Sequence, residues 1–151
     1  MSPREEQRLA DYLGHILQAI ERIDRYTENI SEVMFLEDEM AQDAVIRNFE
    51  IIGEASHNIE DRYPEFATNH PELPLAFAYQ MRNAVAHGYF NVDLEIVWKT
   101  IHNDLPGLYE QGRSSSRCCR GICRCSAHAR TRSRTTSNTA SSCPAPCCAT
   151  R

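Results

Sequence analysis

The chain has 151 residues, a usual length for one domain with a tail, and carries 21 acidic against 16 basic residues. Without an apolar run of about 18 residues or a charged-then-apolar leader, the sequence excludes a membrane span and predicts a soluble cytoplasmic protein. All of the acidic residues but only eight basic ones lie in residues 1–111, which therefore carry a formal net charge of −13. Residues 112–151 carry +8 and all seven cysteines.

The first two predicted helices are long and amphipathic. Apolar residues recur at spacings of three and four from Pro3 to Tyr26, and Pro3 suits the first turn of a helix. The same periodicity runs from Asp38 to Arg62, and Pro64 ends it. Gly53 lies inside this second helix at a cost of about 1 kcal/mol relative to alanine, so we expect a neighbouring helix to approach it closely.

Two shorter helices are predicted next. One runs from Leu75 to His87 and ends at Gly88, and the other begins after Asp93 as its N-cap. This last helix is expected to end at about Pro106 or to continue irregularly for a few residues. No alternating strand pattern and no hairpin turn pair occurs in the sequence. The acidic region therefore predicts an all-α fold, an antiparallel bundle of four to five helices.

Residues 112–151 form a tail of mostly Arg, Ser, Ala, Cys, Thr and Pro, with Ile122 as its one large aliphatic residue. Such a segment cannot bury enough apolar surface to offset the entropy of ordering it, so we expect it to be unstructured. A metal-binding or redox segment is an alternative, but the cysteine spacing is irregular and lacks the paired Cys-x-x-Cys motifs of a zinc site. The abrupt change at Gly112 favours a reading-frame change near the end of the gene, with a basic nucleic-acid arm as the next interpretation.

The stretch MRNAVAHGYFNVD, residues 81–93, places four chemically capable side chains within eight residues: Arg82, Asn83, His87 and Tyr89. On a helix, Asn83 and His87 share a face, whereas Arg82 is rotated from Asn83 by about 100 degrees. Each residue alone is typical of a structural role, such as an ion pair, a helix end or a core aromatic. Their concentration favours a site.

Together these residue types support metal-independent phosphodiester chemistry. His87 can exchange a proton near neutral pH, Arg82 offers a planar fork for phosphate oxygens, and Asn83 can orient the imidazole or stabilise developing charge. RNA supplies its own nucleophile, the 2′-hydroxyl, so a base, a phosphate clamp and a leaving-group acid suffice. No paired carboxylates or His/Cys cage accompany the motif, so we expect no metal and no cofactor. One motif supplies one histidine, which favours a homodimer with a shared site.

The segment RNAVAHGY, residues 82–89, resembles the Arg-x4-His-x-Tyr signature of HEPN domains of the HepT type, the toxins of bacterial and archaeal toxin–antitoxin pairs. Three further segments are similar to that family: DEMAQDAVIRNFEIIGEA at residues 38–55, VDLEIVW after the motif, and IHNDLPGL. The resemblance covers residues 6–111, so it leaves out the tail.

This resemblance implies a HEPN-like helical dimer that acts as a metal-independent endoribonuclease toxin of a type VII-like system. Arg82 would bind the scissile phosphate, His87 would serve as general acid/base, and Asn83 would support their geometry. An MntA-type nucleotidyltransferase antitoxin would silence the toxin by transferring AMP to Tyr89. A bulky anionic adenylate beside the motif would block the cleft and repel RNA.

The acidic charge supports an alternative interpretation. Proteins that bind RNA gain affinity by releasing counterions at basic patches, whereas residues 1–111 carry −13. RNA contact would have to be confined to a cleft around Arg82 from both subunits, with Arg47 or Lys99 as further cations, or be helped by the basic tail. The alternative is a non-catalytic helical dimer that binds a nucleotide or a nucleotidyltransferase partner without cutting RNA.

Three other residues carry structural expectations. Glu54, next to Gly53, is expected to be solvated or paired. Trp98 is expected in the core or in a dimer interface. His15 has no ligand-like spacing to another histidine and is expected at the surface.

Overall fold

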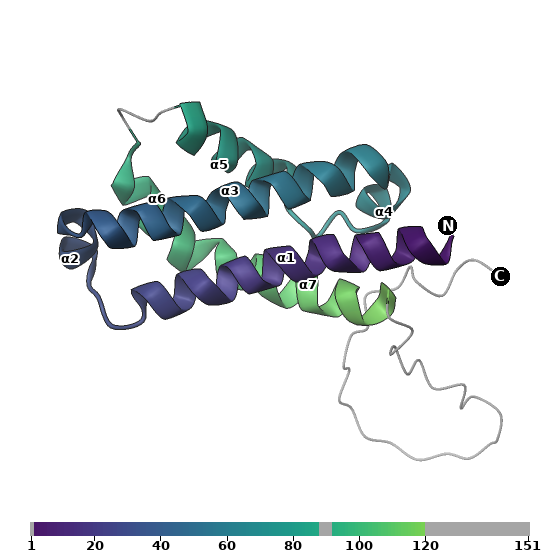
Figure 1. The fold of residues 1–151 in the computed structure, drawn as a ribbon, viewed down its shortest axis with the longest axis horizontal. Helices are drawn as coiled ribbons and strands as arrows, with labels where there is room; N and C mark the ends of the chain where they lie inside the picture. The colour runs from purple at the N-terminus through teal and green to yellow at the C-terminus, as the bar shows by residue number, and fades with distance from the viewer. Residues whose placement is uncertain (1, 88–91, 120–151) are drawn as a thin grey trace, which may run out of the picture.

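The computed structural model describes residues 2–87 and 92–119, and they form a bundle of helices (Figure 1). The helices, in chain order, are α1 Pro3–Thr27, α2 Glu32–Glu37, α3 Glu39–Arg62, α4 Pro64–Asn69, α5 Leu75–His87, α6 Leu94–Asn103 and α7 Leu105–Cys119. The long helices α1 and α3 pack against each other in antiparallel directions, with α5 against α3 and α7 against α1. The predicted all-α antiparallel bundle is therefore confirmed for the described part of the chain.

Side-chain caps determine where the main helices begin. The Glu5 backbone N–H donates to Ser2 Oγ at 3.4 Å, and the Ser2 N–H donates to the Glu5 carboxylate at 2.6 Å. These hydrogen bonds, the one from the Ser2 backbone above all, hold the pKa of Glu5 below its usual value. Asp38 caps α3 by accepting two backbone N–H groups at 3.0 and 3.1 Å. Asp93 caps α6 in the same way, as predicted.

The core lies between the inward faces of α1, α3, α5, α6 and α7. The short helix α2 adds Phe35, which is fully buried and lies with its ring centroid 5.3 Å from that of Trp98. Trp98 is partly buried against the core. Burying each large apolar side chain stabilises the fold by roughly 1.5–3 kcal/mol. The fully buried apolar side chains include Phe35, Leu9, Leu13, Ile16, Ile20, Ile23, Val45, Ile52, Ile59 and Val97.

The helices after the motif differ from the prediction. α6 ends at Asn103, and a separate helix, α7, begins at Leu105 instead of an irregular continuation. The sequence predicts a stop at Pro106, but this proline lies in the first turn of α7. There the missing N–H has no helical acceptor to lose, and the fixed φ of proline suits the helix.

The C-terminal boundary of the helical domain also differs from the prediction. α7 continues past Gln111 to Cys119, so the first eight residues of the expected unstructured tail are helical. Ser115 and Ser116 are buried. This end of α7 is ordered by packing against α1, which the low apolar content of residues 112–119 did not indicate. Residues 120–151 lie outside the described residues.

Two short helices, α2 and α4, were not predicted. Ser31 caps α2 by accepting the Met34 N–H at 3.4 Å, and α4 begins directly at Pro64, the residue expected only to end the preceding helix. Each has six residues, too few for a periodic pattern to reveal. Of the helices in the described ranges, none is long and apolar enough to cross a bilayer.

Candidate functional site

Arg82 is positioned by the close contact between α3 and α5. A Cβ atom added at Gly53 would collide with the Arg82 Cβ and would lie 2.8 Å from its Cγ and 3.0 Å from the Ala78 carbonyl oxygen. Only glycine allows α5 to come this near, so the close approach expected at Gly53 is confirmed. The stem of Arg82 is thereby held directly over α3.

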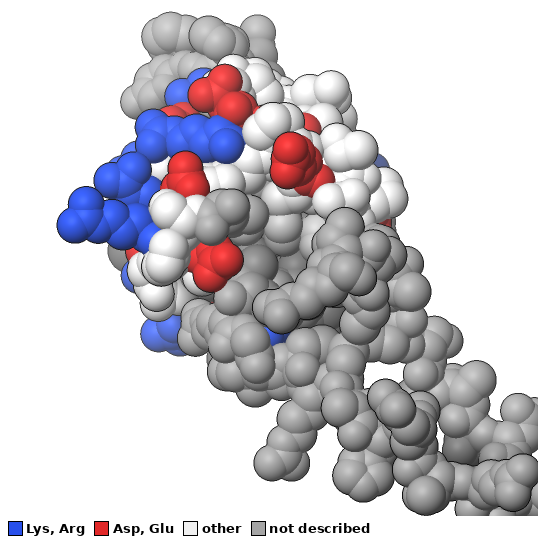
Figure 2. Space-filling model, turned by 90° about the vertical axis from the view of Figure 1, so that its right-hand side faces the viewer, with Lys and Arg blue, Asp and Glu red and all other residues white. Residues whose placement is uncertain are grey.

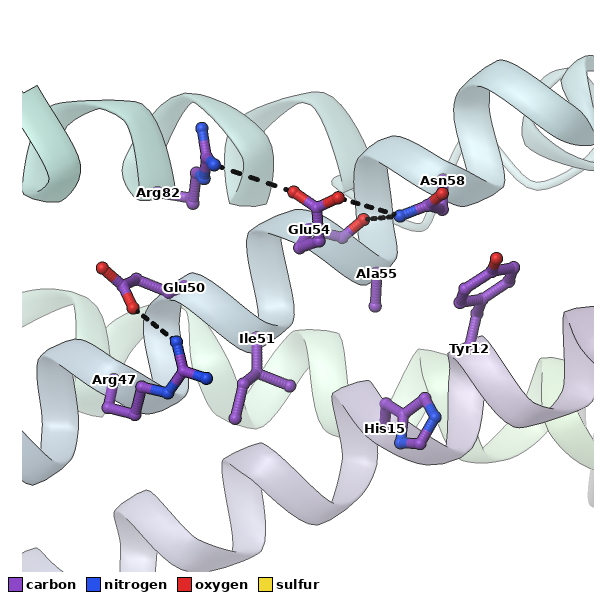
Figure 3. Close-up of a pocket in the computed structure, with 9 residues that line it drawn as sticks. All are labelled: Tyr12, His15, Arg47, Glu50, Ile51, Glu54, Ala55, Asn58 and Arg82. Atoms are coloured by element: carbon purple, nitrogen blue, oxygen red, sulfur yellow. Dashed lines mark hydrogen bonds and ion pairs between the residues drawn. The ribbon is translucent and has the colours of Figure 1, made fainter.

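The guanidinium of Arg82 is held by two neighbours. Its Nη1 donates to Asn83 Oδ1 at 2.9 Å, and its Nη2 lies 3.7 Å from Glu54 Oε2, the contact drawn as a dashed line from Arg82 in Figure 3. The Arg82 side chain is 32 % exposed and that of Glu54 59 %, so solvent and ligands can reach the group. Glu54 was expected to be either solvated or paired, and it is paired with Arg82. The exposed pair is weak, which lets a stronger anion replace the carboxylate.

A pocket of about 360 Å³ opens beside Arg82 between α1, α3 and α5. Most of its lining side chains are polar or charged, and Ile51 and Ala55 are the apolar ones. Figure 3 shows the α1 side chains across from the α3 and α5 side chains. The pocket is lined by Tyr12, His15, Arg47, Glu50, Ile51, Glu54, Ala55, Asn58 and Arg82.

The structure separates the two further cations considered for RNA contact. Arg47 lines the pocket with Arg82, and its Nη1 donates to Glu50 Oε2 at 2.9 Å on the same helix. Lys99 lies on α6, where its Nζ is 3.9 Å from Glu95, and it does not line this pocket. Arg47 is therefore the cation associated with Arg82.

The remaining motif residues are only partly described. Asn83 lies on α5 and accepts the hydrogen bond from Arg82, so these two neighbours are brought together despite their rotation on the helix. His87 is the last residue of α5, but its side chain lies outside the description. Tyr89 and the expected helix end at Gly88 lie outside the described residues. The catalytic assignment of His87 and the modification of Tyr89 therefore stay predictions.

Sequence reasoning missed the contribution of α1 to the pocket. Tyr12 and His15 are three residues apart, so helical geometry places them on one face, and that signal was present in the sequence. Which residues of α3 they face depends on how the two helices pack, which periodicity does not specify. His15 is exposed, as expected, but its position in the pocket gives it access to a ligand.

Acidic and imidazole side chains in the described ranges form no group of three or more His, Cys, Asp or Glu residues that could hold a metal ion. The polar contacts of Arg82 come from the Asn83 amide and the Glu54 carboxylate, and Arg47 adds a second guanidinium to the pocket. Chemically, the pocket offers charged N–H donors to an anionic ligand.

The fold and this pocket define a small all-helical domain that presents an arginine fork for an oxyanion. The chain belongs to the ribonuclease HepT-like family, whose sequence profile matches residues 16–114. The matched region contains Arg82 and the pocket side chains of α3 and α5, whereas Tyr12 and His15 precede it.

Individual relatives agree with this membership. The "Probable ribonuclease HepT" of Thermococcus cleftensis is 46 % identical over 98 residues, which are 65 % of this chain and 86 % of that protein. A protein of Methanocaldococcus jannaschii, named as a gamma-glutamylcyclotransferase and candidate RNase, is 40 % identical over 66 % of this chain and 44 % of its own length. A candidate RNase of Caldanaerobacter subterraneus is 37 % identical over 66 % of this chain and 87 % of its own. No solved structure matches the chain significantly.

Proposed function

We propose that this chain is the toxin component of a type VII-like toxin–antitoxin system and acts as a metal-independent endoribonuclease. Membership of the ribonuclease HepT-like family and the names of its relatives support the reaction class. The observation that carries the proposal is the guanidinium of Arg82, which is one-third exposed beside a polar pocket and held by Asn83. A planar fork in this position can bind two oxygens of one phosphodiester.

The proposed reaction is an internal transfer within the RNA strand. The 2′-hydroxyl attacks the adjacent phosphorus while His87, as general base, takes its proton. Arg82 stabilises the negative charge that develops on the phosphoryl oxygens, and Asn83 keeps the guanidinium oriented. The P–O bond to the 5′-oxygen then breaks, and a general acid protonates that oxygen. The products are a 2′,3′-cyclic phosphate and a 5′-hydroxyl end.

A homodimer would supply both proton-transfer groups. One motif carries one histidine, so His87 of one copy would act as the base and the same residue of the second copy as the acid. The acidic body of the chain also favours a confined cleft, because two copies of Arg82 would concentrate positive charge where the phosphate binds.

Regulation is proposed to act on Tyr89. An MntA-type nucleotidyltransferase antitoxin would transfer AMP from ATP to the Tyr89 hydroxyl, which loses its proton as pyrophosphate leaves. Tyr89 lies two residues after His87 in the chain. The added phosphate is negative and bulky, so it would repel the RNA backbone and occupy the cleft. Intact-mass measurement after incubation with ATP and such an antitoxin should show one added adenylate in the wild type and none in Tyr89→Phe.

The cleavage test uses labelled single-stranded RNA in EDTA. We expect the wild type to cut, and Arg82→Ala and His87→Ala to lose at least about 100-fold in rate, because each removes a group that acts in the transition state. Lys99→Ala, an exposed cation away from the pocket, is the matched control and should cut as the wild type does.

Two results would contradict this assignment in different ways. Equal cleavage by the wild type, Arg82→Ala and His87→Ala would reject the site. A folded wild type that binds RNA or a nucleotide without cutting RNA would favour the alternative, a non-catalytic helical dimer that holds a nucleotide or a nucleotidyltransferase partner. This second function is supported by Glu50 and Glu54, because each of these carboxylates pairs with one of the two pocket arginines and opposes the binding of RNA phosphates.

A further inference from the structure

We propose that the pocket between α1 and α3 is a binding groove for the single-stranded RNA that flanks the cleaved phosphate. In this flanking groove, defined by Tyr12, His15, Arg47 and Asn58, Arg47 and His15 contact phosphate groups and Tyr12 stacks on a base. The inference rests on the proposed function, because Arg82 marks where the cut strand lies.

The geometry favours a strand that runs on from Arg82. The pocket extends from Arg82 on α5 across α3 to Tyr12 and His15 on α1, so one ligand can contact all three helices (Figure 3). Its volume of about 360 Å³ lies in the range of roughly 300–1,000 Å³ typical of small-molecule sites. This is room for part of a strand, and the open walls let the strand continue.

The composition of the groove suits a nucleotide better than a simple anion. Tyr12 is half-buried, so its ring is held in place while one part of it remains accessible. Within the described ranges its hydroxyl forms no hydrogen bond. Single-stranded RNA is recognised by stacking bases on aromatic side chains while cations follow the backbone. The ring of Tyr12 lies near His15 on α1, and Arg47 on α3 lines the same pocket toward its other end, so one strand can meet both parts of this arrangement.

Further cations continue the groove along α1. At 3.6 residues per turn, Arg8, Tyr12, His15 and Arg22 fall within about 80 degrees of the helix circumference and span about 21 Å of its length. Arg8 and Arg22 are exposed. Figure 2 shows Lys and Arg side chains gathered along its left edge, the side that faces the reader in Figure 1. The strongly negative net charge is therefore unevenly spread, and this face offers a path for RNA.

The carboxylates in the groove do not prevent RNA from binding. Glu50 pairs with Arg47 at 2.9 Å, and the Arg47 side chain is 72 % exposed. An exposed pair of this kind is weak and is screened by salt, so an RNA phosphate can take its place. Until then Glu50 holds the guanidinium at the edge of the groove.

The test measures binding without cleavage. Fluorescence anisotropy of a labelled 2′-O-methyl single-stranded RNA, which lacks the internal nucleophile, gives the Kd for the full-length wild type and its variants at several salt concentrations. Arg47→Ala should bind several-fold more weakly, and the slope of log K against log salt should fall by roughly 0.7, the loss of one phosphate contact. Lys99→Ala is the control, because Lys99 is also an exposed helical cation paired with a glutamate on its own helix, and it should bind like the wild type.

A second pair of variants tests the stacking role. Tyr12→Leu keeps the apolar bulk but removes the aromatic ring, and we expect a Kd at least about 5-fold higher. Tyr12→Phe keeps the ring and should bind like the wild type. Circular dichroism melting of each variant separates a loss of binding from a loss of folding.

The groove is rejected if Arg47→Ala and Tyr12→Leu bind as tightly as the wild type, or if Lys99→Ala weakens binding as much as Arg47→Ala. Cleavage of unmodified RNA by the wild type distinguishes this failure from failure of the proposed function. Cleavage with unaffected groove variants rejects only the groove. Wild type that binds through Arg47 and Tyr12 without cutting rejects only the nuclease.

Discussion

The α3–α5 contact and the α1–α7 contact each place a helical glycine against a neighbouring helix, but the two glycines meet different atoms. A Cβ at Gly53 would collide with the Arg82 Cβ and lie 3.0 Å from the Ala78 carbonyl oxygen, so the backbone of α5 would have to move. A Cβ at Gly112 would lie 3.2 Å from Leu17 Cδ2, the end of a flexible side chain. The first contact is fixed by backbone proximity and the second by ordinary packing.

This difference shows which helix contact has no room for an added atom. The contact that tolerates no added atom is the one that positions Arg82, the proposed phosphate ligand. A functional group is precise when its stem is fixed by rigid elements, and a helix held directly on another helix meets that condition. The α1–α7 contact carries no residue of the pocket lining from α7, and its role is to close the bundle.

The largest effect is expected for Gly53→Ala. Overpacking of this kind destabilises a fold by roughly 1–3 kcal/mol, which exceeds the gain of about 1 kcal/mol in helix propensity. Urea unfolding should show the loss. RNA cleavage by the folded protein should fall at least about tenfold, because a displaced α5 misplaces Arg82. A Gly53→Ala protein as stable and as active as the wild type would show that the α3–α5 contact can accommodate a Cβ without displacing Arg82.

Gly14→Ala is the control with open space. Apart from its chain neighbours and the backbone of its own helix, no atom of the described residues lies within 4 Å of a Cβ at Gly14. The helix α1 should therefore gain stability of about 0.5–1 kcal/mol from the lost glycine flexibility. The same urea titration measures it, and cleavage should not change. Destabilisation here would mean that a helical glycine in this bundle is required for reasons other than close approach.

Gly112→Ala should change the free energy of unfolding by an amount near zero, between the loss at Gly53 and the gain at Gly14. The gain in helix propensity is offset by the shift that Leu17 must make. A double-mutant cycle sharpens the test, because in the Leu17→Ala background the same change should stabilise by about 0.5–1 kcal/mol. If Gly112→Ala had the same effect on stability with Leu17 and with Leu17→Ala, the Leu17 side chain would not be what offsets the gain in helix propensity.

A similarly small effect is expected at the surface of the α1–α7 contact. The Tyr109 hydroxyl donates to Glu21 at 2.8 Å, and this hydrogen bond to a carboxylate raises the pKa of Tyr109 above its ordinary value of 10. Because folding raises the pKa of Tyr109, its hydrogen bond stabilises the folded state fully at pH values below the pKa of tyrosine in the unfolded chain. This stabilisation is lost as the pH rises through the pKa in the folded state. Tyr109→Phe should therefore lower the urea midpoint slightly at pH 8, and the difference should vanish at high pH. Tyr26→Phe, an exposed tyrosine of α1, is the control, and a pH-independent difference at Tyr109 would contradict the account.

The sequence predicted the elements that have strong local signals. The bounds of α1, α3 and α5 agree with the apolar periodicity, the Asp93 cap was predicted, and Gly53 correctly indicated a close helix. The short helices α2 and α4 were missed because they have too few turns for periodicity, and α7 because Pro106 was interpreted as an end rather than a beginning.

The pocket could be predicted only in part. Arg82 and Asn83 were found from residue chemistry, and the structure joins them by a hydrogen bond. Tyr12 and His15 could not be assigned to the same pocket, because their distance from Arg82 in the chain is bridged only by the packing of α1 on α3. Local patterns specify faces of helices, and the packing of the bundle decides which faces meet.

The central claim is that the planar guanidinium of Arg82 acts on the scissile phosphate without a metal. Single-turnover cleavage of labelled RNA in EDTA, by the wild type and by Arg82→Lys, tests it most directly. Lysine keeps the charge but loses the two-pronged fork, so we expect the rate constant to fall at least about tenfold while Lys99→Arg remains at the wild-type rate. The claim would be contradicted if Arg82→Lys cleaved RNA at the wild-type rate. It would also be contradicted if the wild type did not cleave in EDTA but did so with added divalent metal.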